Sequence, residues 1–250
     1  MHHLRAAGVV ATAIALLLGA EGAAARQVEG SSAGRGGRAA LEIPLVVAST
    51  HVHETSGRIE REIHAAVLAK EEAPVRDAHI ERALILARQL VNDAPDAADA
   101  HYWLGVALGL RTEYSGAFSK LTSGKACYEA TARALELDPD HAGAHELLGR
   151  IHAGVMRLPW LVRKLGGSLG MNEALDQASW DSAEEHFVRS TELDPRAISP
   201  RLELGKLLAD RERPDEARAW LERALKIAPD GELDAPMQEE ASALLGGSGA

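Results

Sequence analysis

The most constraining feature of this 250-residue sequence is a Leu-Gly pair that recurs at a fixed distance after a proline. The leucine follows the proline by nine residues in three places: Pro95 and Leu104, Pro139 and Leu148, Pro195 and Leu204. A fourth proline, Pro229, closes a last unit of 34 residues over 198–231. A period of this length indicates stacked supersecondary units that bury their apolar faces against one another.

The residues between these landmarks predict that each unit is a pair of helices. In the last unit Ala217, Leu221 and Ala224 stand at helical spacing, and earlier units fill these slots with Cys127, Thr131 and Ala134 and with Ala183, Phe187 and Ser190. The glycine of each Leu-Gly pair lets the second helix approach closely, and proline stops that helix. Cys127 is therefore expected to be a small packing residue. An aromatic content of only 4% also favours closely packed helices over a β-sandwich.

The earlier units are longer than the last one. Pro95 to Pro139 is 44 residues and Pro139 to Pro195 is 56, which exceeds 34 by 10 and by 22. Both excesses fall after the Leu-Gly pair, so we expect helical insertions in the inter-helix turns. The predicted repeat domain covers 54–246, with units at about 54–97, 98–141, 142–197 and 198–231 and a cap helix at 236–245.

This pattern resembles the tetratricopeptide repeat, which implies an all-α, right-handed helical solenoid, or α-α superhelix. Three further stretches narrow the resemblance: His101-Tyr102-Trp103-Leu104-Gly105, the Leu158-Pro159-Trp160 segment, and the helix start at Trp180. With them, residues 60–246 resemble the regulator of microtubule dynamics family. That resemblance implies a tetratricopeptide-like interaction module, and animal members of the family are linked to microtubules and to membrane contacts.

The first 25 residues predict a secretory signal peptide. A weakly basic start precedes an apolar run over 6–20, which is shorter than the roughly 20 residues that a spanning helix needs. Ala23-Ala24-Ala25 then fits the small-residue rule for cleavage. We expect cleavage near Ala25, a flexible leader over 26–53 and a periplasmic or secreted location, with an uncleaved anchor as the alternative.

Charge and cysteine content exclude several classes of function. The formal net charge of -10 argues against nucleic acid as the main partner. One cysteine excludes an intrachain disulfide framework. His141, His145 and His152 can share a helix side as metal ligands, but two of them match packing positions of the repeat. We expect no metal, no cofactor and no catalytic residues, and therefore a non-enzymatic scaffold.

The resemblance to the repeat implies that a protein or peptide partner binds in a concave groove lined by the first helices. The groove-facing candidates are Asp99, Tyr102, Val106, Glu146, Arg150, Leu202, Lys206 and Asp210.

The longer insertion offers an alternative binding surface. Leu158, Leu161, Val162, Leu165 and Leu169 follow helical spacing, with basic residues on other sides. This stripe either packs on the solenoid, with Trp160 filling a gap between helices, or docks on a membrane surface or a partner. In the second case the protein is a peripheral membrane adaptor, and the docking candidates are Trp160, Arg163 and Lys164.

Overall fold

The structure is a computed structural model that describes residues 39–114, 117–159 and 177–247. These residues are helical or lie in the turns between helices, so the predicted all-α class is confirmed. The described helices are α1 (Ala39–Leu68), α2 (Ala73–Asp93), α3 (Ala98–Tyr114), α4 (Ala117–Leu137), α5 (Ala142–Arg157), α8 (Trp180–Leu193), α9 (Ser199–Asp210), α10 (Pro214–Leu225) and α11 (Asp234–Gly247).

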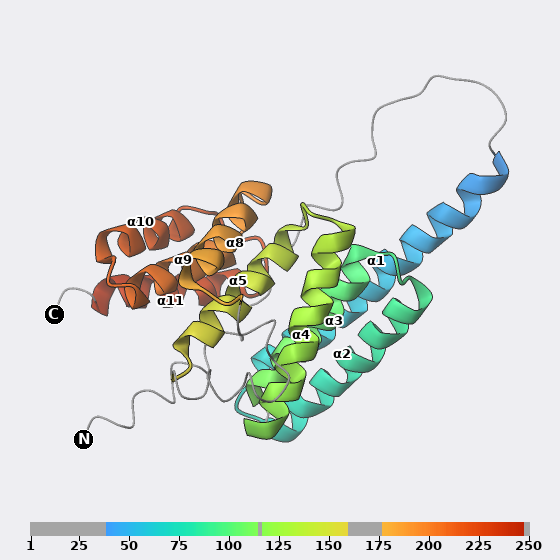
Figure 1. The fold of residues 1–250 in the computed structure, drawn as a ribbon, viewed down its shortest axis with the longest axis horizontal. Helices are drawn as coiled ribbons and strands as arrows, with labels where there is room; N and C mark the ends of the chain where they lie inside the picture. The colour runs from blue at the N-terminus through green and yellow to red at the C-terminus, as the bar shows by residue number, and fades with distance from the viewer. Residues whose placement is uncertain (1–38, 115–116, 160–176, 248–250) are drawn as a thin grey trace.

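The helices pack in pairs that follow one another along the chain. α1 packs on α2, α3 on α4, α5 on α8 and α9 on α10, and each pair also contacts the next. Figure 1 shows the pairs as a row that runs from α1 and α2 at one end to α10 and α11 at the other. The first helices also contact one another in order, α1 with α3, α3 with α5, α5 with α9 and α9 with α11. We call these five helices the first row.

Close approach within the pairs depends on the Leu-Gly glycines, as the sequence predicts. A Cβ atom added to Gly149 would lie 2.8 Å from the ring of Phe187, and one added to Gly205 would lie 2.5 Å from Leu221 Cδ2. Phe187 and Leu221 belong to the second-helix positions expected to face these glycines. The close contact between the two helices therefore recurs at the same position of successive units.

The turns between units also share a hydrogen bond from a side chain of the next helix to the carbonyl of the turn proline. His101 Nε2 bonds the Pro95 carbonyl at 2.7 Å, and His145 Nε2 bonds the Pro139 carbonyl at 2.9 Å. Arg201 donates from NH2 to the Pro195 carbonyl at 2.8 Å. Each of these residues lies three positions before the leucine of a Leu-Gly pair, so one position of the unit ties its first helix to the preceding turn.

Two boundaries differ from the sequence-based expectation. Helix α1 begins at Ala39, so the flexible leader expected over 26–53 is wrong for residues 39–53. Once a helix is nucleated, each added residue gains a hydrogen bond, so it can extend beyond its packed part. The 10-residue excess is not a separate insertion either: α3 and α4 have 17 and 21 residues, whereas α9 and α10 have 12 each.

The longer insertion occupies residues 158–179, between α5 and α8, where the sequence places it. Trp160, Arg163 and Lys164 fall outside the described residues. Among the helices that are described, none combines the length and the apolar character needed to cross a membrane.

Candidate functional site

Most of the predicted groove residues lie inside the protein. The side chains of Tyr102, Val106 and Leu202 are 5%, 0% and 0% exposed and belong to the apolar core. The prediction that they line an open groove is therefore wrong. Burying an apolar side chain of this size stabilises the fold by about 1.5–3 kcal/mol relative to leaving it exposed, which favours an arrangement of the first row that covers these three residues.

The ends of the first row provide this cover. Ile59 of α1 and Met237 of α11 belong to the same apolar cluster as the three buried residues. His64 Nδ1 of α1 also lies 3.5 Å from Oε2 of Glu232, just before α11. α1 thus reaches the residues that precede α11, although more than 150 residues separate them in sequence. The predicted groove residues Tyr102, Val106 and Leu202 are enclosed in an apolar cluster to which both ends of the first row contribute.

Glu146, Arg150 and Lys206, which were predicted to face an open groove, instead belong to a buried network that we call the charged cluster. Arg150 donates to Glu146 Oε1 at 2.9 Å and lies 3.2 Å from Oε1 of Glu203 on α9. Lys206 Nζ binds Glu203 at 3.0 Å and Glu240 of α11 at 2.7 Å. The charged cluster therefore joins α5, α9 and α11.

Ser199 completes the charged cluster. Its hydroxyl accepts from Arg150 at 2.6 Å and donates to Glu146 Oε1 at 2.5 Å. Ser199, Glu203 and Glu240 were not predicted as site residues. The signal that could have indicated Glu203 is a charged residue beside the leucine of the last Leu-Gly pair, where the earlier units have Trp103 and Leu147.

The electrostatics of the charged cluster are governed by burial and mutual compensation. Burial raises the pKa of Glu146, and Arg150 and Ser199 oppose this shift. Burial acts in the same direction on Glu203, but Arg150 and Lys206 outweigh it, so the pKa of Glu203 is lowered. The guanidinium of Arg150 stays charged, because the two carboxylates raise its pKa against the effect of burial. These groups hold one another and are enclosed, which is the behaviour of a structural ion network.

The two remaining candidates lie at opposite ends of the first-row helices. Asp99, near the start of α3, accepts from His141 Nε2 at 3.0 Å, and this hydrogen bond lowers the pKa of Asp99. His141 Nδ1 accepts from the backbone N–H of Ala144, so the proton must be on Nε2. Asp210, at the end of α9, pairs with Arg157 at 2.8 Å. The structure does not bring Asp99 and Asp210 together.

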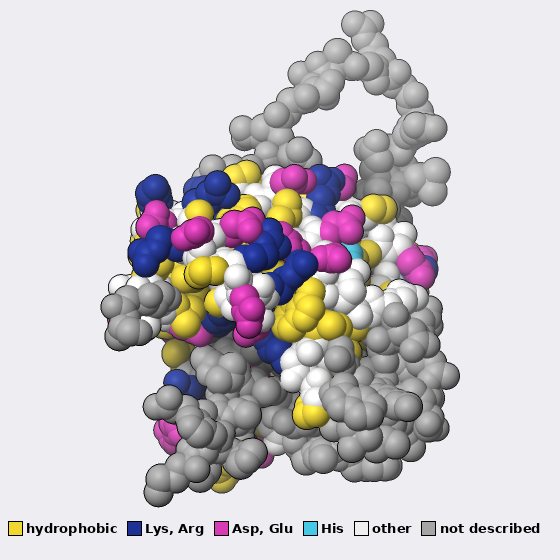
Figure 2. Space-filling view, turned by 60° about the vertical axis from the view of Figure 1, so that its left-hand side comes forward, with side chains coloured by type: hydrophobic (Ala, Val, Ile, Leu, Met, Phe, Trp, Pro, Cys, Tyr) yellow, Lys and Arg dark blue, Asp and Glu magenta, His cyan; other side chains and the backbone are white. Residues whose placement is uncertain are grey.

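A partly exposed group of side chains surrounds the end of α9, and we call it the rim. Arg157, the last residue of α5, pairs with Asp210 and lies 6.0 Å from the Trp180 ring centroid. Arg211 pairs with Asp181 at 2.8 Å. The rim consists of these five residues: Arg157, Trp180, Asp181, Asp210 and Arg211. Figure 2 shows acidic and basic side chains interspersed on the side where the C-terminal helices come forward.

Cys127 is a packing residue, as predicted. Its side chain is 3% exposed, and its thiol donates to the Gly105 carbonyl at 3.2 Å. Burial raises the pKa of the thiol to about 12, so the reactive thiolate is absent at neutral pH.

The three histidines considered as metal ligands do not converge on one point. His141 forms the N-cap of α5, whereas His145 and His152 flank His186 of α8. Across residues 39–114, 117–159 and 177–247, no group of three or more His, Cys, Asp or Glu side chains is arranged to hold a metal ion. No sequence pattern singles out His186, because its contact with His145 arises only when α8 packs on α5.

Comparison with known proteins identifies the family. A family model described as Regulator of microtubule dynamics protein 1-3 matches residues 50–248. Regulator of microtubule dynamics protein 3 of Rattus norvegicus is 30% identical over 155 residues, which cover 60% of this chain and 32% of the relative. Regulator of microtubule dynamics protein 1 of Mus musculus is 26% identical over 191 residues, covering 76% of this chain and 61% of the relative.

The human protein 1 is 25% identical over 167 residues, which cover 66% of this chain and 52% of the relative. The chain matches about a third of the length of the protein 3 relatives and somewhat more than half of the protein 1 relatives. The family match extends over most of the 250 residues and includes all the described helices from α2 to α11. The chain therefore belongs to the Regulator of microtubule dynamics protein 1-3 family.

Proposed function

We propose that this chain is a non-enzymatic interaction module that binds a partner protein at the rim. Membership of a family of regulators and an all-helical array support an adaptor role. The side chains with reactive or charged groups in the interior are bonded to other residues of the chain. Cys127 is buried, and Glu146 and Arg150 neutralise each other in the charged cluster. We therefore place the partner-binding surface of the tetratricopeptide-like array at accessible surface residues and not in the predicted groove.

The observation that carries this proposal is the composition and position of the rim. It combines an aromatic side chain, Trp180, with charges of both signs, which is typical of the centre and edge of protein interfaces. Asp181 and Asp210 are 86% and 36% exposed, so their carboxylates are available to a partner. The rim also lies where the inserted residues 158–179 leave and rejoin the array. The rim and the ends of the longer insertion thus lie at the same edge of the array.

Charge reversal at the rim tests this proposal. The partner is first captured by crosslinking in the native compartment and identified, and its affinity for the purified chain is then measured. The double variant Asp181→Lys, Asp210→Lys is expected to bind the partner at least tenfold more weakly. Two accessible carboxylates are replaced by cations, which repel the partner groups that the carboxylates attract.

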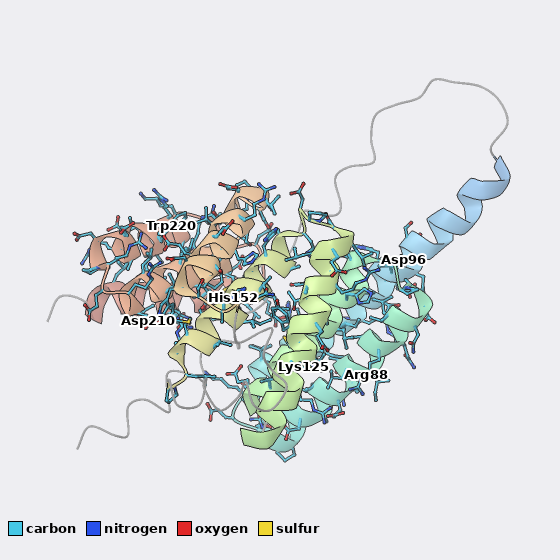
Figure 3. All side chains as sticks on the ribbon, in the orientation of Figure 1. Arg88, Asp96, Lys125, His152, Asp210 and Trp220 are labelled. Atoms are coloured by element: carbon cyan, nitrogen blue, oxygen red, sulfur yellow. The ribbon has the colours of Figure 1, made fainter. Side chains whose placement is uncertain are left out.

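Asp96→Lys is the matched control. Its carboxylate is 91% exposed and lies in the turn between α2 and α3. Figure 3 labels Asp96 and Asp210 in different parts of the array. Equal partner affinity in the rim variant and the Asp96 variant, with unchanged circular dichroism, would refute the rim as the binding surface.

The alternative function is a membrane-associated adaptor that docks through the basic amphipathic insertion 157–169. Residues 157–159 are the described part of this segment, and the helical spacing of its apolar residues in the sequence is the feature that favours the alternative. Sedimentation with vesicles that contain anionic lipid tests it. Loss of sedimentation in the variant Trp160→Asp, with an unchanged melting temperature, would support membrane docking over internal packing.

The names of the relatives suggest a further partner class and the N-terminus suggests a compartment. The relatives are named as regulators of microtubule dynamics, so co-sedimentation with purified microtubules tests whether that partner extends to this chain. We also propose a periplasmic or secreted location after cleavage near Ala25. N-terminal sequencing of the protein from its native cells tests this, and an intact Met1 would contradict it.

A further inference from the structure

Helix α11 covers two of the residues that the sequence assigns to partner binding. It packs on both helices of the last pair, α9 and α10, at the C-terminal end of the row (Figure 1). Met237 and Ala241 of α11 share an apolar cluster with Leu202 of α9. Glu240 pairs at 2.7 Å with Lys206, which lies one turn along α9 from Leu202. Helix α11 therefore holds the place where a partner helix would meet Leu202 and Lys206.

Few buried side chains hold α11 on the array. Of its 14 residues, Asp234, Met237 and Ala241 are buried, whereas α9 buries eight of its 12 residues. Its last two residues, Gly246 and Gly247, disfavour a helix, and a Cβ added to either would meet nothing within 4 Å, so packing does not require glycine there. Elements with few buried apolar contacts open locally at a lower free energy than the core. We therefore expect α11 to detach while the rest of the array stays folded.

The face beneath α11 offers a cation and backbone acceptors to a helix. The side chain of Lys206 is 13% exposed even with Glu240 bound to it. Gln238 Nε2 donates to the carbonyl of Ala224 at 3.1 Å and to that of Ile227 at 2.8 Å, at the end of α10. A helix that replaces α11 must therefore supply an acidic side chain, an amide donor near it and an apolar stripe.

The tether of α11 determines which kind of helix can replace it. Residues 226–233 join α11 to α10, and Asp234 Oδ2 accepts from the backbone N–H groups of Asp230 and Gly231 at 2.8 and 2.9 Å. A short tether keeps α11 at a high effective concentration beside its own face. The α11 of a second copy makes the same contacts without that advantage. The occupant that can displace α11 is therefore a helix of a different protein, longer than α11 and without its terminal glycines.

We propose that the face of α9 and α10 beneath α11 docks an amphipathic helix of a partner protein, which displaces α11. The motif of that helix follows α11: an apolar residue, an acidic residue three positions later, and apolar residues four and eight positions later. These positions correspond to Met237, Glu240, Ala241 and Leu245, of which the three apolar ones are buried or partly buried in the cluster. This docking face is separate from the rim, which surrounds the end of α9.

A fluorescent synthetic peptide of residues 232–247 tests the proposal with the full-length chain. Anisotropy is expected to show weak binding to the wild-type chain, because the tethered α11 competes for the same face. In the Glu240→Lys chain, Lys206 repels the chain's own α11, so the wild-type peptide should bind about tenfold more tightly or better. A peptide that carries Glu240→Lys should lose this gain.

Glu239→Lys is the matched control, because it makes the same change of charge at an exposed neighbouring position of α11. Its affinity for the peptide should equal that of the wild-type chain, and circular dichroism establishes that both variants are folded. A second measurement uses the wild-type chain alone. Binding of the peptide should speed hydrogen exchange of the α11 amides about tenfold or more and leave the α9 amides unchanged, because only a displaced helix loses its protection.

Three results would overturn the proposal. The first is equal affinity of the peptide for the Glu240 and Glu239 variants. The second is bound peptide with α11 amides that stay protected, because the peptide then occupies another surface. The third is a wild-type dimer in light scattering that dissociates when the peptide is added, because the face then belongs to the α11 of a second copy.

Discussion

Replacing Gly149 by alanine tests the close approach on which the helix pairs depend. Gly149 lies in the Leu-Gly pair of α5 and faces the ring of Phe187, which is 0% exposed. An added Cβ would lie 2.8 Å from two atoms of that ring and 3.1 Å from a third. Contacts this short force a movement, and the enclosed ring has little space for one. We therefore expect a loss of stability despite the higher helix propensity of alanine.

The same helix provides the control that isolates this effect. A Cβ added to Gly154, five residues further along α5, would meet nothing within 4 Å. Alanine in place of glycine favours a helix by at most about 1 kcal/mol at either site. Overpacking in a filled core costs about 1–3 kcal/mol. The helix preference cancels between the two variants, so Gly149→Ala should be less stable than Gly154→Ala by about 1–3 kcal/mol.

Chemical denaturation followed by circular dichroism measures this difference directly. In a domain of this size each kcal/mol also shifts the melting temperature by about 2–4 °C. Phe187→Leu should relieve part of the clash, so a double-mutant cycle of Gly149→Ala with Phe187→Leu should show favourable coupling. If Gly149→Ala stabilises the protein as much as Gly154→Ala does, the second helix does not depend on that glycine and the reasoning is wrong.

Three further predictions address the charged cluster, the cysteine and the first turn of α3. Arg150→Met leaves Glu146 and Glu203 buried without their shared cation, and should lower the free energy of unfolding by about 3–5 kcal/mol in a denaturant titration; a loss below about 1 kcal/mol would contradict the burial argument. Cys127 should resist iodoacetamide in the native protein at pH 8 and react after unfolding, because its thiol is buried with a pKa raised to about 12; rapid native labelling would contradict this placement. The folded pKa of Asp99 lies below its ordinary value of 3.8, so its contribution to stability is present above that pH and is lost as the pH falls through the folded pKa. Asp99→Asn should remove this part of the acid sensitivity of the melting temperature, and an unchanged pH profile would show that the bond to His141 does not stabilise the fold.

The helix pairs of this molecule can be predicted from the spacing of a few residues. Proline lacks the N–H that continues a helix, so Pro95, Pro139 and Pro195 stand in the turns between units. A glycine facing Phe187 or Leu221 permits close approach of the two helices of a pair. For this reason the spacing of Pro195, Leu204 and Gly205 was enough to predict helix pairs and the packing role of Cys127. The same spacing located the second insertion between α5 and α8.

Which surfaces the pairs leave open follows from the three-dimensional packing of the whole row. Whether the first and last helices meet depends on the sum of all packing angles along the row, and no local spacing records that sum. Tyr102 and Leu202 are buried in an apolar cluster that also contains Ile59 of α1 and Met237 of α11. The packing of α11 on α9 brings Glu240 to Lys206. A charged residue on a predicted groove helix thus became part of a buried ion network, because burial is a property of the whole array and not of a residue's place in its repeat.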